Sequence, residues 1–197
     1  MTAQQKSPYS MEQYLQLERS SEDKHEYYDG DMFVLAGTSE RHNRIAVNIL
    51  ANLHGQLRRQ PCRVYSSDMR IKIPQVRAYT YPDISLVCGK PLFDDEEKDT
   101  LLNPIVIFEI LSPSTERYDR GKKFSSYRTI STLQEYILVS QDKISLEHYI
   151  RQTDNQWLLI VYTHKTNVAT LNAIQCQLLL EDIYDDVSVD VSDIEEA

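Results

Sequence analysis

Two apolar runs of strand-like composition each carry one carboxylate, and they constrain the fold more than any other part of the sequence. The first run reads DISLVC at residues 83–88, and the second reads IVIFEIL at residues 105–111. Runs that are apolar on both faces are typical of central strands that other elements cover on both sides. The sequence therefore predicts two interior strands, with Asp83 opening one and Glu109 near the end of the other.

These two carboxylates also suggest a reaction. Burying a carboxylate is costly unless it is paired with a cation or binds a metal ion. A basic segment, RGKK at residues 120–123, follows the second run. Strand-borne acids that hold Mg²⁺, with a lysine beside the attacking water, are what a metal-dependent phosphodiesterase needs. Taken singly, each acid has a plainer explanation as an edge-strand residue and each lysine as a solvated charge; taken together, they favour the site.

An ordered series of motifs extends over roughly residues 10 to 150. The series resembles the PD-(D/E)XK nuclease superfamily, and more narrowly a bacterial branch of it that is treated as restriction endonucleases and grouped as a domain of unknown function. The motifs are HEYYDG at 25–30, GTSERH at 37–42, Pro82-Asp83, EILSPST at 109–115, DRGKK at 119–123, Tyr127 and Glu135-Tyr136.

The resemblance implies a fold and a metal site. The fold is α/β and restriction-endonuclease-like: a mixed central β-sheet flanked by helices, with an added N-terminal helix and hairpin. Asp83 and Glu109 are expected to hold Mg²⁺ or Mn²⁺, and the resemblance adds the main-chain carbonyl of Ile110 as a third ligand. Two or three protein ligands suffice, because Mg²⁺ keeps several of its waters.

The sequence departs from the superfamily pattern at one position. A lysine is expected two residues after Glu109, but Leu111 stands there. The branch is thought to supply the lysine from the following helix, where Lys123 matches the position and Lys122 is the fallback. The role implied for this lysine is to orient the attacking water or to stabilise charge on the transition state.

Two residues upstream complete the predicted site. Glu26, in the first hairpin, is expected either to be a further ligand or to position the lysine. His42, in the first turn of a helix, is expected to contact the phosphate or a water on the metal, with a solvent-facing position near the helix end as the alternative.

The remaining elements follow from local signals. Ser10 and either Thr38 or Ser39 are helix caps, Asp29-Gly30 is a hairpin turn, and Ser114 or Thr115 is expected to cap the helix that carries Lys123. The predicted strands are residues 25–28, 32–36, 62–66, 69–73, 83–87, 105–111, 135–139, 144–151 and 157–163, with a short helical turn after Leu178.

The 197 residues suit a single domain, with residues 1–9 and about 185–197 as mobile tails. No apolar run is long enough to span a bilayer and the start lacks a signal-peptide pattern, so the expected location is cytoplasmic. The cysteines, Cys62, Cys88 and Cys176, are odd in number and far apart. They suggest neither a zinc site nor a disulfide framework, and Cys62 and Cys88 are interpreted as buried thiols.

The net charge of −9 argues against broad, tight nucleic-acid binding, because phosphate contacts need Lys and Arg. Acidic residues concentrate at 94–97 and 181–196, however, which leaves basic groups between them for a substrate face. The leading hypothesis is a metal-dependent endonuclease acting on nucleic acid, with DNA favoured over RNA and a homodimer implied by the resemblance. The alternative is a catalytically inactive nuclease fold that binds nucleic acid or a protein partner.

Overall fold

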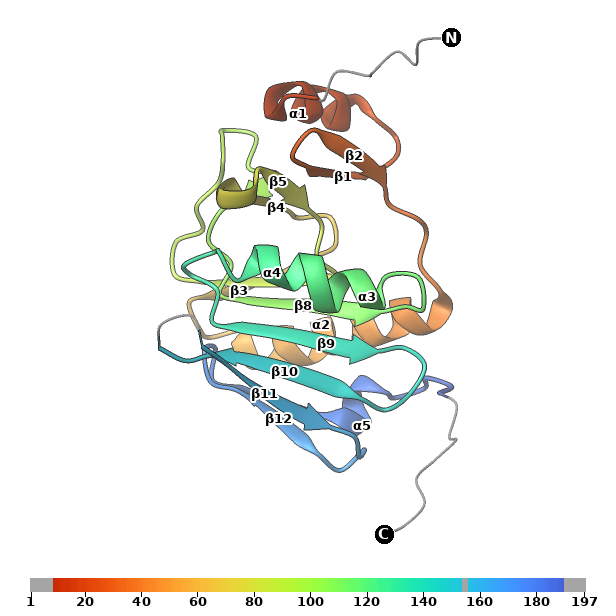
Figure 1. The fold of residues 1–197 in the computed structure, drawn as a ribbon. Coiled ribbons are helices and arrows are strands. Elements are labelled where there is room, and N and C mark those ends of the chain that lie inside the picture. Colours follow the sequence, from red (N-terminus) through yellow and green to blue (C-terminus); the bar gives the residue numbers. More distant parts are fainter. Residues whose placement is uncertain (1–8, 154–155, 190–197) are drawn as a thin grey trace.

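A six-stranded mixed β-sheet lies at the centre of the computed structural model, which describes residues 9–153 and 156–189 (Figure 1). The strand order is β11-β10-β9-β8-β6-β3, with β8 and β9 parallel and the other neighbours antiparallel. Both acid-bearing runs form interior strands of this sheet, β6 and β8, as predicted. The bounds are β3 Cys62–Ser66, β6 Ile84–Cys88, β8 Val106–Leu111, β9 Glu135–Ser140, β10 Leu146–Arg151 and β11 Trp157–Tyr162.

Helices cover both faces of this sheet, which confirms the mixed α/β architecture (Figure 1). On one face, α2 (Glu40–Leu57) packs Ile45, Ile49 and Leu53 against alternate side chains of the central strands. On the other face lies a short helical segment made of α3 (Glu116–Tyr118), the π-helical turn η2 (Asp119–Lys123) and α4 (Phe124–Tyr127). No helix in the described ranges is both long enough and apolar enough to cross a membrane.

A second sheet, which the sequence did not predict, lies above the first in Figure 1 and includes the N-terminal hairpin. The hairpin itself forms as predicted, and its turn residues Asp29 and Gly30 both have positive φ. Its strand β1 pairs with β5, and β4 pairs in parallel with β7, so the strand order is β2-β1-β5-β4-β7. The elements are α1 Met11–Ser20, β1 His25–Tyr28, β2 Asp31–Val34, β4 Arg70–Ile73, the 3₁₀ turn η1 Pro74–Val76, β5 Ala78–Thr80 and β7 Thr100–Leu101.

A C-terminal hairpin completes the core on the α2 side. Strands β12 (Val168–Leu171) and β13 (Cys176–Leu179) were not predicted, whereas the short helix α5 (Leu180–Ile183) was. The chain after α5 remains attached to α2, because Asn48 donates to the carbonyl of Asp185 and Arg44 pairs with Asp186. The rest of the expected C-terminal tail, from residue 190, and residues 1–8 of the N-terminal tail lie outside the described residues.

The interpretation of Cys62 and Cys88 as separate buried thiols is wrong. The antiparallel register of β3 and β6 places these two residues directly opposite each other, and they form a disulfide. The two cysteines are 26 residues apart in the sequence, and the sequence did not reveal their contact. The contact depends on which strands pair and in which register. Disulfides are rare in reducing compartments, so this bond is unusual for a protein expected in the cytoplasm.

Candidate active site

Glu109 is a buried carboxylate in the middle of the molecule. Along β8 it lies on the same face as Ile107 and Leu111, whose side chains pack on the α4 side of the sheet. Its side chain is 4% exposed. The hydroxyl of Tyr127 on α4 donates a hydrogen bond of 2.9 Å to Glu109 Oε1. The sheet therefore presents one acid to the helical segment that crosses it.

Lys123, the predicted lysine, meets Glu109 from that segment. Its Nζ lies 2.9 Å from Glu109 Oε1 and 3.2 Å from Glu26 Oε1. Lys122, the fallback, is exposed and places its ammonium 3.6 Å from the centre of the Tyr28 ring. The structure thus brings Lys123, and not its neighbour, to the acid on β8.

The segment that carries Lys123 is not the single capped helix that was expected. It is interrupted by the π-helical turn η2, and Thr115, which precedes α3, makes no side-chain capping bond. A π turn adds a residue to the helical repeat and is frequent at functional sites. Asp119 and Lys123 are the first and last residues of this turn, and both are buried.

Asp83 lies just before β6 and contacts the main chain beside Glu109. Its Oδ2 accepts a hydrogen bond of 2.7 Å from the N–H of Ile110. The β6–β8 ladder ends at the pair Ile84–Phe108, so Ile110 lies beyond it on the edge that faces Asp83. Because the N–H and C=O of one strand residue point to the same side, the Ile110 carbonyl also lies on the Asp83 side.

The two upstream residues reach the same region from different elements. Glu26, on β1, pairs with Lys123 and also accepts a hydrogen bond of 3.2 Å from the N–H of Tyr81. His42 lies in the first turn of α2, which Ser39 caps, and its Nε2 is 3.3 Å from Asp83 Oδ2. His42 is therefore largely buried and directed at an acid, and the alternative of a solvent-facing helix end does not apply.

Two further side chains of this cluster were not among the predicted site residues. Asp119 lies 3.7 Å from Lys123 Nζ and is buried. Tyr127, besides donating to Glu109, shares a hydrogen bond of 3.1 Å with Thr80. The i,i+4 spacing of Asp119 and Lys123 is that of an ordinary helical salt pair, and only the burial of both side chains shows that the pair belongs to the cluster.

Comparison with known proteins identifies the family of this chain. Residues 11–181 match the Uma2 family, whose description reads "Putative restriction endonuclease". The chain belongs to the Uma2 family. Two uncharacterized proteins of Synechocystis are similar to it, each at 37% identity: sll1609, over 75% of this chain and 83% of its own length, and slr1290, over 78% and 80%.

A solved structure supports the fold of this Uma2 protein. It is described as a putative nuclease belonging to DUF820 from Anabaena variabilis, and it superposes with a TM-score of 0.76 at 18% sequence identity. The match covers 92% of this chain and all of the other. The restriction-endonuclease-like fold expected from the motifs is thereby confirmed.

The cluster of this Uma2 chain carries more negative than positive charge. Three carboxylates, on Glu26, Glu109 and Asp119, surround the ammonium of Lys123, and the charge of Asp83 acts on Glu109. Burial, followed by the charges of the neighbouring acids, raises the pKa of Glu109 well above its usual value, against the pull of Lys123. Burial likewise raises the pKa of Asp119. Burial opposes the charge of Lys123, but Glu109 and Glu26 outweigh it, and the pKa of the lysine lies well above its usual value.

This charge balance and donor set fit a hard divalent cation. Asp83, Glu109 and the Ile110 carbonyl offer oxygen donors, the type that Mg²⁺ and Mn²⁺ prefer. Within the described part of the chain, no three His, Cys, Asp or Glu side chains gather closely enough to hold a metal by themselves. One or two carboxylates are the usual protein share of a Mg²⁺ site, the remainder being water and substrate phosphate, so two acids are compatible with this ion.

The raised pKa of Glu109 predicts a pH effect on stability. A group whose pKa is raised on folding stabilises the fold below its unfolded pKa and loses that contribution as pH rises through its folded pKa. From pH 4.5 upwards the wild type should therefore lose stability that Glu109→Gln does not lose. Urea unfolding at several pH values measures this, and the variant should be at least as stable as the wild type near neutral pH.

A matched control for this experiment is Glu96→Gln, which removes an exposed carboxylate from the loop before β7. Its stability should follow the wild type at every pH. If Glu109→Gln were instead less stable than the wild type at all pH values, the Glu109–Lys123 pair would be a net stabilising contact, and the expectation drawn from the raised pKa of Glu109 would be wrong.

Proposed function

We propose that this chain is a metal-dependent endonuclease that hydrolyses phosphodiester bonds in nucleic acid, with DNA as the first choice of substrate. One observation carries the proposal. The buried acid Glu109 and the buried lysine Lys123 are 2.9 Å apart, and the next residue after Glu109 donates its main-chain N–H to Asp83. Keeping this many charges out of water is expensive, and catalytic sites are where such arrangements are commonly found.

Each residue has a role in this proposal. Asp83, Glu109 and the Ile110 carbonyl hold Mg²⁺ or Mn²⁺, which supplies polarisation of the scissile phosphate and a lowered pKa for a bound water. Lys123 donates hydrogen bonds to the phosphate oxygen on which negative charge develops. Glu26 holds Lys123 in place, and His42 orients Asp83 through the 3.3 Å contact.

The ion pairs around the site limit the number of basic side chains that are available to bind nucleic acid. Several basic residues of the middle of the chain are engaged in ion pairs: Arg70 with Asp99, Lys72 with Asp94, and Arg120 with Glu116 and Glu147. Arg117, on α3, is exposed and lies on the same helical segment as Lys123. We therefore propose modest affinity that depends on salt, and a homodimer, because cutting both strands of a duplex calls for two sites.

Cleavage assays test this function directly. Supercoiled plasmid, linear duplex, single-stranded DNA and RNA are incubated with the protein in Mg²⁺, in Mn²⁺ and in EDTA, beside Glu109→Gln purified in the same way. Metal-dependent cutting by the wild type that Glu109→Gln lacks supports the proposal, and sedimentation of the same sample tests the dimer. Cutting that persists equally in Glu109→Gln would have to come from a contaminant or from another site.

A second function has its own support. Lys123 is surrounded by three carboxylates and the net charge of the chain is −9, both of which disfavour a nuclease that holds its substrate tightly. The alternative is a nuclease fold reused to bind a protein partner, or nucleic acid, without cutting. This alternative predicts no cleavage of any of the four substrates in either metal. A retarded band in EDTA for one of them would then identify nucleic acid as the ligand.

A further inference from the structure

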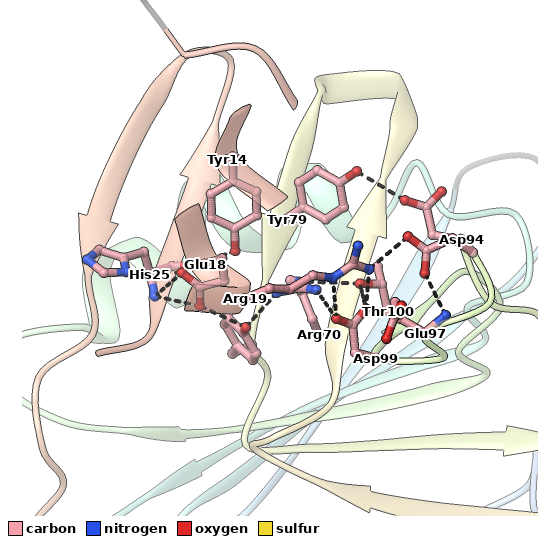
Figure 2. A network of polar contacts seen from close by, with 12 residues as sticks. Tyr14, Glu18, Arg19, His25, Arg70, Tyr79, Asp94, Glu97, Asp99 and Thr100 are labelled. Carbon is pink, nitrogen blue, oxygen red and sulfur yellow. Dashed lines mark hydrogen bonds and ion pairs between the residues drawn. The ribbon is translucent and has the colours of Figure 1, made fainter. Parts of the chain in front are cut away.

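A network of polar contacts joins α1 to the second sheet (Figure 2). At its centre is Arg70 of β4, which is 2% exposed. Its guanidinium lies 2.8 Å from Asp99 and donates to the hydroxyl of Thr100 at 2.9 Å. Arg19 of α1 pairs with the same Asp99 at 2.8 Å. The network therefore ties the first helix to the loop before β7.

One carboxylate of this network, Glu18 at the end of α1, bridges two other segments. It accepts hydrogen bonds from the main-chain N–H of His25 at 3.0 and 3.1 Å, and the ring Nδ1 of His25 lies 3.0 Å away (Figure 2). Glu18 Oε1 also accepts a hydrogen bond of 2.8 Å from the hydroxyl of Tyr81. Arg70 donates to that hydroxyl as well, at 2.9 Å, so the Tyr81 side chain is held from two sides.

These two segments carry acids of the candidate site. His25 directly precedes Glu26 on β1, and Tyr81 stands two residues before Asp83. The N–H of Tyr81 donates to Glu26 Oε1, the same oxygen that faces Lys123. Glu18 thus holds the start of β1 through His25 and the segment before Asp83 through Tyr81. Tyr81 links the two segments to each other, because its hydroxyl donates to Glu18 and its main-chain N–H donates to Glu26.

We propose that Glu18 and Tyr81 are positioning residues that set the separation of Glu26 and Asp83. This inference rests on the proposed function, since it assigns these residues to the geometry of that site. Neither of them touches metal or substrate in this scheme. Side chains that orient ligands from behind typically change metal affinity or activity by about 10–100-fold when they are replaced.

The test compares two tyrosines of the same network. Tyr81→Phe removes the hydroxyl that joins Glu18 to the Asp83 segment and keeps the ring. Tyr79→Phe is the matched control, because its hydroxyl donates at 3.1 Å to Asp94 in the same network and has no link to Glu26 or Asp83. Glu18→Gln is the second variant, which keeps the size of the side chain but lacks one of the two carboxylate acceptors.

The measurements are Mn²⁺ binding by calorimetry, with and without duplex DNA, and kcat and KM for cleavage. Tyr81→Phe and Glu18→Gln should weaken Mn²⁺ binding and lower kcat by about 10–100-fold with little change in KM, whereas Tyr79→Phe should stay within about twofold of the wild type. Thermal denaturation of all three variants checks that each is folded.

The outcomes separate this inference from the function on which it rests. If the wild type binds Mn²⁺ and cuts but Tyr81→Phe behaves like Tyr79→Phe, the positioning role is overturned while the nuclease proposal stands. If Tyr81→Phe loses kcat and metal affinity only in proportion to a loss of folded protein, the hydroxyl is merely structural and the inference fails. If the wild type neither binds metal nor cuts with DNA present, both proposals fall.

Discussion

Lys123→Met is expected to slow nucleic-acid cleavage by about 10²–10⁴-fold, the range typical of a positioned group that acts in the transition state. Methionine keeps much of the aliphatic stem and removes the ammonium that lies 2.9 Å from Glu109. Metal binding should survive, because the lysine is not a ligand in the proposed site. Single-turnover cleavage rates with saturating Mn²⁺ measure the effect.

The neighbouring lysine provides the control. Lys122→Met removes an exposed ammonium over the Tyr28 ring and should leave the single-turnover rate within a few fold of the wild type. The reverse pattern, with Lys122→Met inactive and Lys123→Met active, would contradict the assignment of Lys123. Equal rates for both variants and the wild type would sink the idea that a lysine from the helix has replaced the one absent at Leu111.

The same substitution has a large expected cost in stability. Removing one partner from a buried ion pair typically costs about 3–5 kcal/mol, because the remaining charge has no compensation. In Lys123→Met, the acids Glu109, Glu26 and Asp119 would remain together. The pKa values of Glu109 and Asp119 are already raised by burial, so the deficit should shrink as pH falls and these acids take up protons. Urea unfolding at neutral and mildly acidic pH measures this change.

Asp83→Asn is expected to abolish saturable Mn²⁺ binding, with affinity falling by more than about 100-fold, because the acid is one of only two proposed side-chain ligands. The fold should persist, since the amide oxygen of asparagine still accepts the hydrogen bond from the Ile110 N–H. Calorimetric titration of Mn²⁺ into both proteins, with and without duplex DNA, makes the comparison without any assumption about the recognition sequence.

Asp94→Asn is a suitable control for that titration. Asp94 has a side-chain exposure of 15%, against 16% for Asp83, and it also pairs with a basic side chain, Lys72. It contacts Lys72 and the hydroxyl of Tyr79, and not Glu18 or Tyr81, so its loss should not affect metal binding. Retained binding in Asp83→Asn would remove Asp83 from the ligand set, and a melted variant would show that its role is structural. An absence of binding by the wild type would favour the binding protein over the enzyme.

Local sequence signals were sufficient for much of the fold. The Asp29-Gly30 turn, the helix caps at Ser10 and at Thr38 or Ser39, and the apolar character of the runs at 83–88 and 105–111 each act within a few residues. They correctly predicted the first hairpin, two helix starts and the two interior strands. The second sheet escaped prediction, because β1 and β5 pair across about fifty residues of chain and no local pattern encodes that contact.

The candidate site, too, could be predicted from the sequence only in part. The order of the motifs in the sequence singled out Asp83, Glu109, Glu26, His42 and Lys123, and the structure brings all five into one connected cluster. The sequence left open which lysine reaches Glu109, and the π turn at Asp119–Lys123 decides it. The place of Asp119 in the buried cluster could not be predicted either, since an i,i+4 pair has the same spacing in the sequence whether it faces water or a buried acid.

The sequence by itself determined the chemistry that is available: strand-borne acids, a basic segment that follows them and membership of the Uma2 family. Only the tertiary structure decided which groups share one buried volume. Residue types and their order are local properties, whereas burial, strand register and the approach of Tyr81 to Glu18 depend on contacts between distant segments. For the same reason, the Cys62–Cys88 disulfide and the hydrogen bond from the Tyr81 N–H to Glu26 appear only once the chain is folded.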